Sequence, residues 1–435
     1  MNFELLKKNH LKRNILTGVG IMIIISACIL TFSLAKYRTT QSIQIAKGTI
    51  NYMPYDFEMI AMYQENHSGN YDPIDQIPSS GYIINEEKSY CTIDGEKDNE
   101  AHFYTDNQGQ HVIQSLKTGS KCQLYFDRVG LNVREAILAN TSINQATPDF
   151  SKTSCTSGCG ESTVGLFQST DNDGTTYYFR GNVENNWVQF AGFYWRIIRI
   201  NGDGSLRLIY SGADNGKIET SNQSGTTTQT ATSPLNASPN YTRSEYVGFM
   251  YSLNQQHGNA NKSTILTALN TWYENNIATE YRDFLSTSTW FCSDRNMASG
   301  YTWSATPSST IRYAAYGRLV STKSPSFNCS NSYDRVNTSN GLTYPIGLIT
   351  ADEIAFAGGV YDTANQNYYL YTGQNYWTMT PFHYPFADVI YLSSNGSLSN
   401  MSVDNSLGIR PVINIRSDAT IFLGNGTITT PYVIS

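Results

Sequence analysis

The stretch WVQFAGFYWRIIRINGDGSLRLIY, residues 187–210, decides the fold that we expect for the larger part of this chain. Two mostly apolar and aromatic runs flank the four residues Asn201-Gly202-Asp203-Gly204. Glycine adopts positive φ at little cost, so two glycines in this short segment predict a tight turn between antiparallel strands. We therefore expect a β-hairpin near the start of a folded unit that runs from residue 165 to residue 435.

Helices and further strands are expected in the rest of this unit. After Ser263, apolar residues recur every three to four positions as far as Ile277, which predicts an amphipathic helix. Thr350-Ala-Asp-Glu353 is a capping box that begins a short helix, and Gly358-Gly359 ends it. The polar segment 211–262 is typical of an exposed loop. The expected closing strands are Tyr376–Thr380, Val389–Leu392 and Ile409–Ile415, with a turn at Asn395-Gly396.

The part of the chain before residue 165 shows a different pattern. Residues 36–128 contain short runs of β-forming residues separated by turns, which predict a small all-β sandwich domain that acts as a stalk. Residues 129–164 are rich in Ser, Thr, Asn and Gly, which favours a linker with a small disulfide loop. The strands expected in the sandwich include Ser42–Tyr52, Tyr82–Ile93 and Lys121–Phe126.

Residues 15–35, ILTGVGIMIIISACILTFSLA, are uncharged and mostly apolar, and they follow a basic segment at residues 1–14. About twenty apolar residues in a helix span the hydrocarbon of a bilayer, so Ile15 to Ala35 predicts a transmembrane helix or signal anchor. Basic flanks stay in the cytoplasm, which predicts a single-pass membrane protein with its C-terminal part outside the cell. Ser33-Leu34-Ala35 also fits a signal-peptidase site, so secretion after cleavage near Ala35 is the alternative.

Cysteine usage agrees with export. Six of the seven cysteines lie beyond the apolar segment, and six cysteines allow fifteen pairings. Disulfides persist in oxidising compartments. A zinc site at Cys155 and Cys159 is disfavoured, because neither a His nor a further Cys pair stands near them, and we expect no metal ion and no cofactor. Separation along the chain favours the pairs Cys91 with Cys122, Cys155 with Cys159, and Cys292 with Cys329.

Composition and charge restrict the class of partner. Aromatic residues make up 13% of the chain, with 31 Tyr among them, and charged residues make up 15%. This mixture suits β-rich surfaces with polar loops and is similar to that of evolved contact surfaces. The formal net charge is −6. Because nucleic-acid binding depends on basic surfaces, we expect no nucleic acid as a partner.

Several motifs follow one another in a recognisable order: WRIIRINGDGSLRLIY, TALNTWYENN, GLITADEIAFAGG, YWTMTP, VIYLSSNGSL and GIRPVINI. In this order they resemble a widespread domain of exported bacterial proteins that has no agreed activity. That family is related in fold to the formylglycine-generating enzymes and to C-type-lectin-like domains. The anchor, β-domain and linker also resemble those of large surface proteins of gut Firmicutes, so the resemblance covers nearly the whole chain. The resemblance implies a C-terminal α+β domain of the C-type-lectin-like kind at residues 165–435.

Two elements of that family are matched by Trp377 with Pro381, in a W-x-x-S/T-P pattern, and by Arg410 in a closing R-P pair. We expect structural roles for these residues. A Trp in an apolar strand fills core, and an Arg in such a strand needs a carboxylate or backbone carbonyls. Glu353, on the short capped helix, is the candidate partner of Arg410.

The expected contact surface is the loop that follows Pro381. His383, Tyr384, Phe386 and Asp388 combine aromatic rings with polar groups on one short segment. Loops on rigid scaffolds concentrate binding residues, and aromatic rings can stack on a sugar or a peptide without a metal ion. A well-packed turn without a ligand is the alternative for the same residues.

No catalytic residues are expected. The chain has no G-x-S-x-G element, its six His are scattered, and Cys292 and Cys329 do not match the redox-active cysteine pair of formylglycine-generating enzymes. The E-P-N and W-N-D patterns of calcium-dependent lectins do not occur. We therefore expect a non-enzymatic, membrane-anchored surface module that binds a glycan or a protein. The alternatives are an exported enzyme of the formylglycine-generating class or a hydrolase, and a receptor whose residues 382–408 vary between copies.

Overall fold

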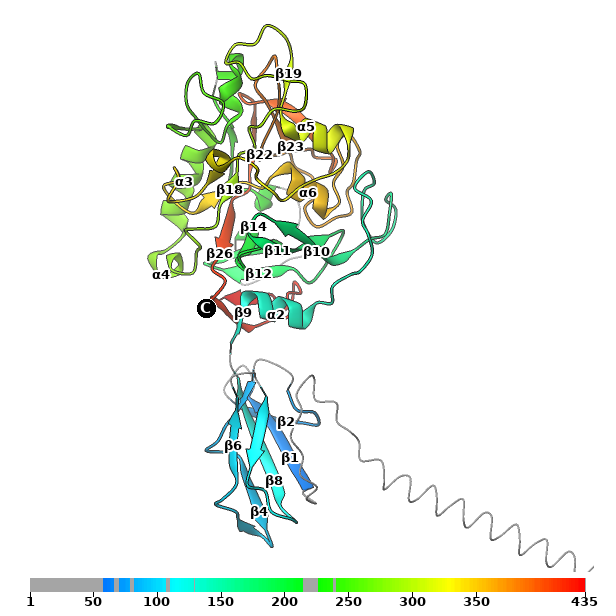
Figure 1. Ribbon diagram of the computed structural model, residues 1–435, viewed down its shortest axis with the longest axis vertical. Coiled ribbons are helices and arrows are strands. Elements are labelled where there is room, and N and C mark those ends of the chain that lie inside the picture. The colour runs from blue at the N-terminus through cyan, green and yellow to red at the C-terminus, as the bar shows by residue number, and fades with distance from the viewer. Residues whose placement is uncertain are drawn as a thin grey trace, which may run out of the picture. The chain divides into compact units, whose positions relative to one another are not determined.

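The computed structural model describes residues 58–65, 70–78, 82–106, 110–128, 130–213, 226–237 and 240–434 (Figure 1). The transmembrane helix expected at Ile15–Ala35 and the first strand expected at Ser42–Tyr52 lie outside these ranges. Within them, no helix combines the length and the apolar character needed to span a bilayer. The described chain divides into two compact units, one built mainly from strands before residue 125 and one mainly from Tyr125–Ser435.

The described residues are mostly β, with 38% in strands and 15% in helices. The expected α+β, C-type-lectin-like class for residues 165–435 is therefore wrong, and the transmembrane helix of the same expected fold is not shown. Both helices expected in the C-terminal part form, but they are short, with 13 residues in α3 (Thr264–Asn276) and seven in α6 (Ala351–Ala357). The Tyr, Thr, Ile and Val runs around them pair as strands, because such residues pack well on pleated surfaces.

Among its described residues, the N-terminal part contains a six-stranded sheet and a two-stranded ladder, β6 with β7. The strands are β1 (Glu58–Glu65), β2 (Tyr71–Ile74), β3 (Tyr82–Ile84), β4 (Tyr90–Ile93), β5 (Glu96–Lys97), β6 (His102–Thr105), β7 (His111–Gln114) and β8 (Lys121–Arg128). The sheet has the order β2-β1-β8-β4-β5, and β3 also pairs with β8. Cys122, Leu124 and Phe126 alternate inward along β8, which confirms the predicted half-buried strand.

The largest sheet of the C-terminal part has ten strands in the described residues. Its strands are β9 (Leu131–Asn132), β10 (Gly165–Asp171), β11 (Gly174–Arg180), β12 (Trp187–Phe190), β13 (Phe193–Ile200), β14 (Leu206–Ala213), β21 (Ile346–Gly347), β26 (Val412–Ile415), β27 (Thr420–Leu423) and β28 (Tyr432–Ile434). The order is β21-β26-β14-β13-β12-β28-β27-β9, and the β10-β11 hairpin joins through β13.

The hairpin expected within residues 187–210 is confirmed. Ile200 pairs with Leu206, and the Asn201 N–H donates to the Ser205 carbonyl across the turn, at 2.8 Å. A second turn, at Ala191-Gly192, has positive φ at both residues and separates β12 from β13. The stretch therefore forms three consecutive antiparallel strands, one more than its two apolar runs indicate.

A second sheet, with six strands in the described residues, includes the strands that directly follow residue 375. Its strands are β15 (Ala231–Pro234), β19 (Ile311–Arg312), β22 (Tyr376–Tyr384), β23 (Asp388–Leu392), β24 (Leu398–Ser402) and β25 (Ser406–Ile409), and the order is β15-β25-β22-β23-β24 with β19 on β22. Two short ladders pair β16 (Met250–Tyr251) with β17 (Asn261–Lys262) and β18 (Phe291–Cys292) with β20 (Arg335–Val336). The expected strand Ile409–Ile415 is divided at Arg410-Pro411 between β25 and β26, because proline lacks the N–H that a central ladder needs.

The helices confirm the capping signals in the sequence. The Ser263 side chain accepts a hydrogen bond from Leu266 N–H at the start of α3, and Thr350 and Glu353 form the capping box of α6. Gly358 ends α6 with a φ of 119°, a conformation that favours glycine. The other helices are α2 (Val133–Asn140), α4 (Thr279–Arg282), α5 (Ala314–Tyr316), the 3₁₀ turns η2 (Thr226–Thr228), η3 (Asn240–Thr242), η4 (Ser244–Val247) and η6 (Ser332–Asp334), and the π-turn η5 (Gly317–Ser321).

One hydrophobic core joins both large sheets of the C-terminal part and includes the buried Trp195 and Trp377. Residues 129–164, expected as a linker, contribute Val133 and Ile137 of α2 to this core, and β9 pairs with β27 near the C-terminus (Figure 1). The segment 211–262, expected as exposed loop, also contributes. Its described residues form β15 to β17, and they bury Leu235, Val247 and Phe249, because isolated apolar residues in a polar segment suffice to anchor it.

Candidate functional site

The three disulfides favoured by the sequence are present. Cys91 is bonded to Cys122, Cys155 to Cys159 and Cys292 to Cys329. The first bond crosses the β4–β8 ladder between directly opposed residues. The second closes a loop of the expected linker, and the third closes a long loop between β18 and β20. All six cysteines beyond residue 35 are therefore paired.

The residues for which we expected structural roles lie in the core. Trp377 is fully buried, and its indole N–H donates to the Ser233 carbonyl at 2.9 Å. Pro381 is also buried, in β22. The Arg410 guanidinium donates to the Tyr210 carbonyl at 2.8 Å and to the Leu370 carbonyl at 3.3 Å. Backbone carbonyls, one of the two kinds of partner that we expected, therefore satisfy this arginine.

Glu353 is not the partner of Arg410, so that candidate pairing was wrong. Its Oε1 lies 2.6 Å from Arg207 Nε and 3.2 Å from Arg199 Nε, and all three side chains are buried. The contact with Arg207 has an ion-pair distance without the alignment of a hydrogen bond. Arg199 and Arg207 are cross-strand partners on β13 and β14, so their side chains project to one face. Their symmetric placement about the predicted turn is a sequence signal that could have identified them.

The four expected contact residues lie together at the end of the β22–β23 hairpin. His383 Nδ1 lies 3.3 Å from Asp388 Oδ2, which also accepts a hydrogen bond from Asn400 Nδ2 at 2.7 Å. The Tyr384 hydroxyl donates to the Thr242 carbonyl at 3.2 Å. Burial raises the pKa of Asp388 above its ordinary value, and the nearby His383 opposes that shift.

The surface of this hairpin end is dominated by one ring. The Phe386 side chain is 54% exposed, and its centroid lies 6.0 Å from that of Tyr241. Asp388 is buried and His383 is half-buried, so these two side chains contact each other and present little surface to solvent. The hairpin end therefore presents one prominent exposed ring, and its use as a contact surface stays a prediction.

A concavity of about 520 Å³ lies elsewhere on the C-terminal part, where three segments distant in sequence meet. These are the Cys155–Cys159 loop, the β11–β12 connection with strand β13, and the segment before β22. No local pattern in the sequence indicates this site, because each of the three segments carries only a few of its residues. The lining residues are Ser157, Asn182, Val183, Glu184, Arg196, Gln366, Asn367, Tyr368, Tyr369 and Tyr371.

The disulfide loop orients one wall of this concavity. The Thr156 N–H and hydroxyl both donate to Asn182 Oδ1, at 2.5 and 2.6 Å. With its oxygen occupied in this way, Asn182 has its amide N–H groups left for a ligand. The rest of the wall presents the amides of Gln366 and Asn367 and the half-buried ring of Tyr371.

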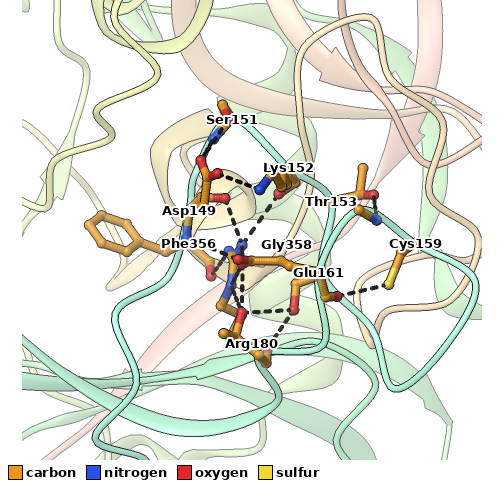
Figure 2. A network of polar contacts seen from close by, with 12 residues as sticks. Asp149, Ser151, Lys152, Thr153, Cys159, Glu161, Arg180, Phe356 and Gly358 are labelled. Carbon is orange, nitrogen blue, oxygen red and sulfur yellow. Dashed lines mark hydrogen bonds and ion pairs between the residues drawn. The ribbon is translucent and has the colours of Figure 1, made fainter.

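Arg180 clamps the disulfide loop to the core, as Figure 2 shows. Its side chain is fully buried and forms an ion pair with Glu161, which follows the loop. It also donates to the Phe356 carbonyl at 3.0 Å, at the C-terminal end of α6, and to the Lys152 carbonyl at 3.4 Å. These bonds from one buried, charge-assisted donor therefore join the residues on either side of the disulfide loop to the end of α6.

Arg196 forms the floor of the concavity. It is only 5% exposed, and its guanidinium lies 4.2 Å from the centroid of the Trp187 ring and 5.3 Å from that of Tyr369. Its Nε donates to Asn186 Oδ1 at 2.6 Å and its Nη2 to the Val183 carbonyl at 2.8 Å. Burial lowers the pKa of Arg196 to about 9, so the guanidinium keeps its charge at neutral pH.

No family model, curated protein or solved structure matched this chain in the three comparisons. The resemblance to exported Firmicutes surface proteins therefore stays a prediction. Within the described residues, no group of three or more His, Cys, Asp or Glu side chains is placed to hold a metal ion.

A second charged cluster lies beside the Cys292–Cys329 bond. Arg318 forms ion pairs with Asp294 and, at 2.9 Å, with Asp352. Burial raises the pKa of Asp294 from 3.8 to about 6, and the attraction of Arg318 offsets only part of that shift. Between about pH 4 and pH 6, Asp294 is therefore protonated in the folded protein and ionised in the unfolded chain.

We expect Asp294 to make the free energy of unfolding fall by about 3 kcal/mol as pH rises from about 4 to about 6. The folded pKa lies above the unfolded one, so this contribution is complete below the window and lost above it. Asp294→Asn should reduce this fall in unfolding free energy with pH. Asp362→Asn is the control, because Asp362 also has positive φ but is exposed, and it should leave the fall unchanged. Urea unfolding at a series of pH values measures both. An undiminished decline in Asp294→Asn would contradict this assignment.

Proposed function

We propose that this chain is an exported binding module that takes a saccharide in the concavity beneath the Cys155–Cys159 loop. The observation that carries the proposal is the lining of that concavity, where amide groups and tyrosine rings surround a volume of about 520 Å³. Small-molecule sites commonly have volumes of this order and a few convergent polar groups. Aromatic rings stack on the apolar faces of sugars, while amides hydrogen-bond to sugar hydroxyls.

Export is supported by the disulfides. Three bonds join all six cysteines beyond residue 35, and such bonds persist in oxidising compartments such as the cell exterior. One of them closes the loop that orients Asn182 at the concavity. Binding at this site therefore depends on the same oxidising environment that we propose for the protein.

The residues that line the concavity favour binding of a saccharide without cleavage of its glycosidic bonds. Glycoside hydrolysis commonly uses two carboxylates on either side of the bond, and Glu184 is the one carboxylate among the lining residues. A redox enzyme of the formylglycine-generating class would use reactive thiols, whereas Cys292 and Cys329 are bonded to each other. These observations favour recognition over the enzymatic alternatives.

We expect Tyr371→Ala to weaken saccharide binding about tenfold, because it removes a half-buried ring that a sugar can stack on. Tyr371→Phe keeps the ring and should keep most of the affinity. A screen of immobilised glycans with the intact protein identifies the saccharide, and calorimetric titration measures both variants.

The Tyr384→Ala, Phe386→Ala double variant is the matched test of the hairpin end. If binding takes place in the concavity, this variant should titrate like the unmodified protein. Loss of binding in the hairpin variant, with full affinity in Tyr371→Ala, would place the contact surface on the residues that the sequence indicated first. A screen in which no saccharide binds would overturn the proposed function.

A further inference from the structure

The arginines buried in the described residues differ in how their charge is balanced. Arg180, Arg199, Arg207 and Arg295 each form an ion pair with a carboxylate. Arg410 has two backbone carbonyls as partners and does not line the concavity. Arg196 forms no ion pair with any described residue, and it lies at the floor of the concavity. The buried arginines are Arg180, Arg196, Arg199, Arg207, Arg295 and Arg410.

The geometry of Arg196 leaves one side of its guanidinium for a ligand. Its bonds to Asn186 and Val183 use Nε and Nη2, while Nη1 remains. The rings of Trp187 and Tyr369 hold the guanidinium in place at 4.2 and 5.3 Å. A buried cation without an anionic partner costs free energy, and an anion that reaches it from the concavity recovers that cost. The cation is therefore placed for a ligand before the ligand arrives.

We propose that the concavity selects saccharides that carry a carboxylate, such as uronic or sialic acids, and that the carboxylate binds Arg196. This inference rests on the proposed function and names the class of ligand for the same site. Arginine recognises carboxylates through charge-assisted, often bidentate hydrogen bonds. The amides of Asn182, Gln366 and Asn367, together with Tyr371, then contact the neutral parts of the sugar.

The lining favours a carboxylate over a phosphate. Arg196 is its one cation, and the remaining donors are neutral amides and hydroxyls. A phosphate carries close to two charges at neutral pH and is commonly held by several cations or by a helix N-terminus. A single guanidinium matches the single charge of a carboxylate, so a phosphate gains less from this site.

Glu184 allows the role of the ligand's charge to be tested separately, because it carries the same negative charge as a ligand carboxylate. It is exposed and lines the concavity, and it acts on Arg196 across space without forming an ion pair with it. A ligand carboxylate bound at Arg196 would feel repulsion from Glu184, which a neutral sugar would not. Because Glu184 is exposed, its replacement by Gln leaves the core intact.

The test is a calorimetric comparison of matched sugars on the intact, oxidised protein. The probes are trigalacturonic acid against its methyl ester, sialyllactose against its methyl ester, and inorganic phosphate as a competitor. We expect the acidic member of at least one pair to bind about tenfold tighter than its neutral counterpart at low salt, and the difference to shrink as ionic strength rises. Glu184→Gln should raise the ratio of acidic to neutral affinity about threefold.

Arg196→Gln should abolish the preference for the acidic member, with near-ultraviolet circular dichroism as the check that the fold is kept. If that variant does not fold, the Glu184→Gln ratio and the salt dependence still decide the question.

Equal binding of acidic and neutral sugars, with no effect of Glu184→Gln, would overturn the carboxylate inference and leave the proposed function standing. Competition by phosphate at the concentration at which the acidic sugar binds would also overturn it. A glycan screen with no bound saccharide at all would overturn both.

Discussion

Glu353→Gln is expected to lower the free energy of unfolding of the C-terminal part by about 3–5 kcal/mol. The carboxylate lies between two buried guanidinium groups, at 2.6 Å from Arg207 Nε and 3.2 Å from Arg199 Nε. Arg199 keeps a second carboxylate, Asp171, at 2.6 Å, but Arg207 is left without one. Removing one member of a buried ion pair leaves an uncompensated charge in a medium of low dielectric constant, and this penalty is the main part of the loss.

Glu135→Gln is the matched control for this substitution. Glu135 is also the third residue of a capped helix, α2, but it is exposed and does not form an ion pair with any described residue. Gln can replace Glu in the capping box of α6, and in α2 the cap bond runs from the Glu135 backbone N–H to the Asn132 side chain, so both variants keep the local helix signal. We expect less than about 0.5 kcal/mol of change for Glu135→Gln in urea unfolding.

Double-mutant cycles separate the two candidate partners of Glu353. Variants of Arg207 should couple to Glu353 by more than about 1 kcal/mol, whereas variants of Arg410 should not couple measurably. Coupling to Arg410 instead of Arg207 would contradict the described arrangement.

Trp377→Ala is expected to cost about 3–5 kcal/mol of unfolding free energy. The side chain is fully buried in β22, among the largest in the core, and its removal leaves a cavity in a close-packed interior. The Ser233 carbonyl also loses the indole N–H that donates to it at 2.9 Å. Thermal and urea unfolding followed by near-ultraviolet circular dichroism measure the loss.

Two further substitutions identify the source of that loss. Trp377→Phe keeps most of the apolar volume but removes the N–H donor, so it should cost less than the Ala variant. Phe386→Ala, nine residues later on the same hairpin, removes a ring that is 54% exposed and should change stability by less than about 0.5 kcal/mol. Equal losses for Trp377→Ala and Phe386→Ala would contradict the burial described for this hairpin.

Local signals in the sequence predicted local structure well. Gly204 adopts positive φ in the predicted turn, whereas Gly202 does not; Ser263 and Thr350 begin helices, and Gly358 ends one. These signals work because each depends on a few neighbouring residues whose backbone conformations and hydrogen bonds are fixed within one turn. The cysteine pairs were also predicted, since short separations make loop closure less costly.

The fold class and the concavity could not be predicted in the same way. The α+β expectation came from a resemblance, and local patterns do not say how the many short strands join into two large sheets. The predicted pairing of Glu353 with Arg410 was wrong for a related reason. The actual partners of Glu353 are set by the cross-strand register of Arg199 and Arg207, which no local pattern shows. The concavity combines the Cys155–Cys159 loop with Asn182 and Tyr371, which meet only through tertiary packing.

Hydrogen–deuterium exchange with and without the saccharide identified by the glycan screen tests most directly whether the concavity is the binding site. We expect slower amide exchange on ligand addition in residues 155–159, 181–186 and 366–371, which surround the concavity, and unchanged exchange in residues 382–388. Protection confined to residues 382–388, with no change around the concavity, would contradict the proposed site.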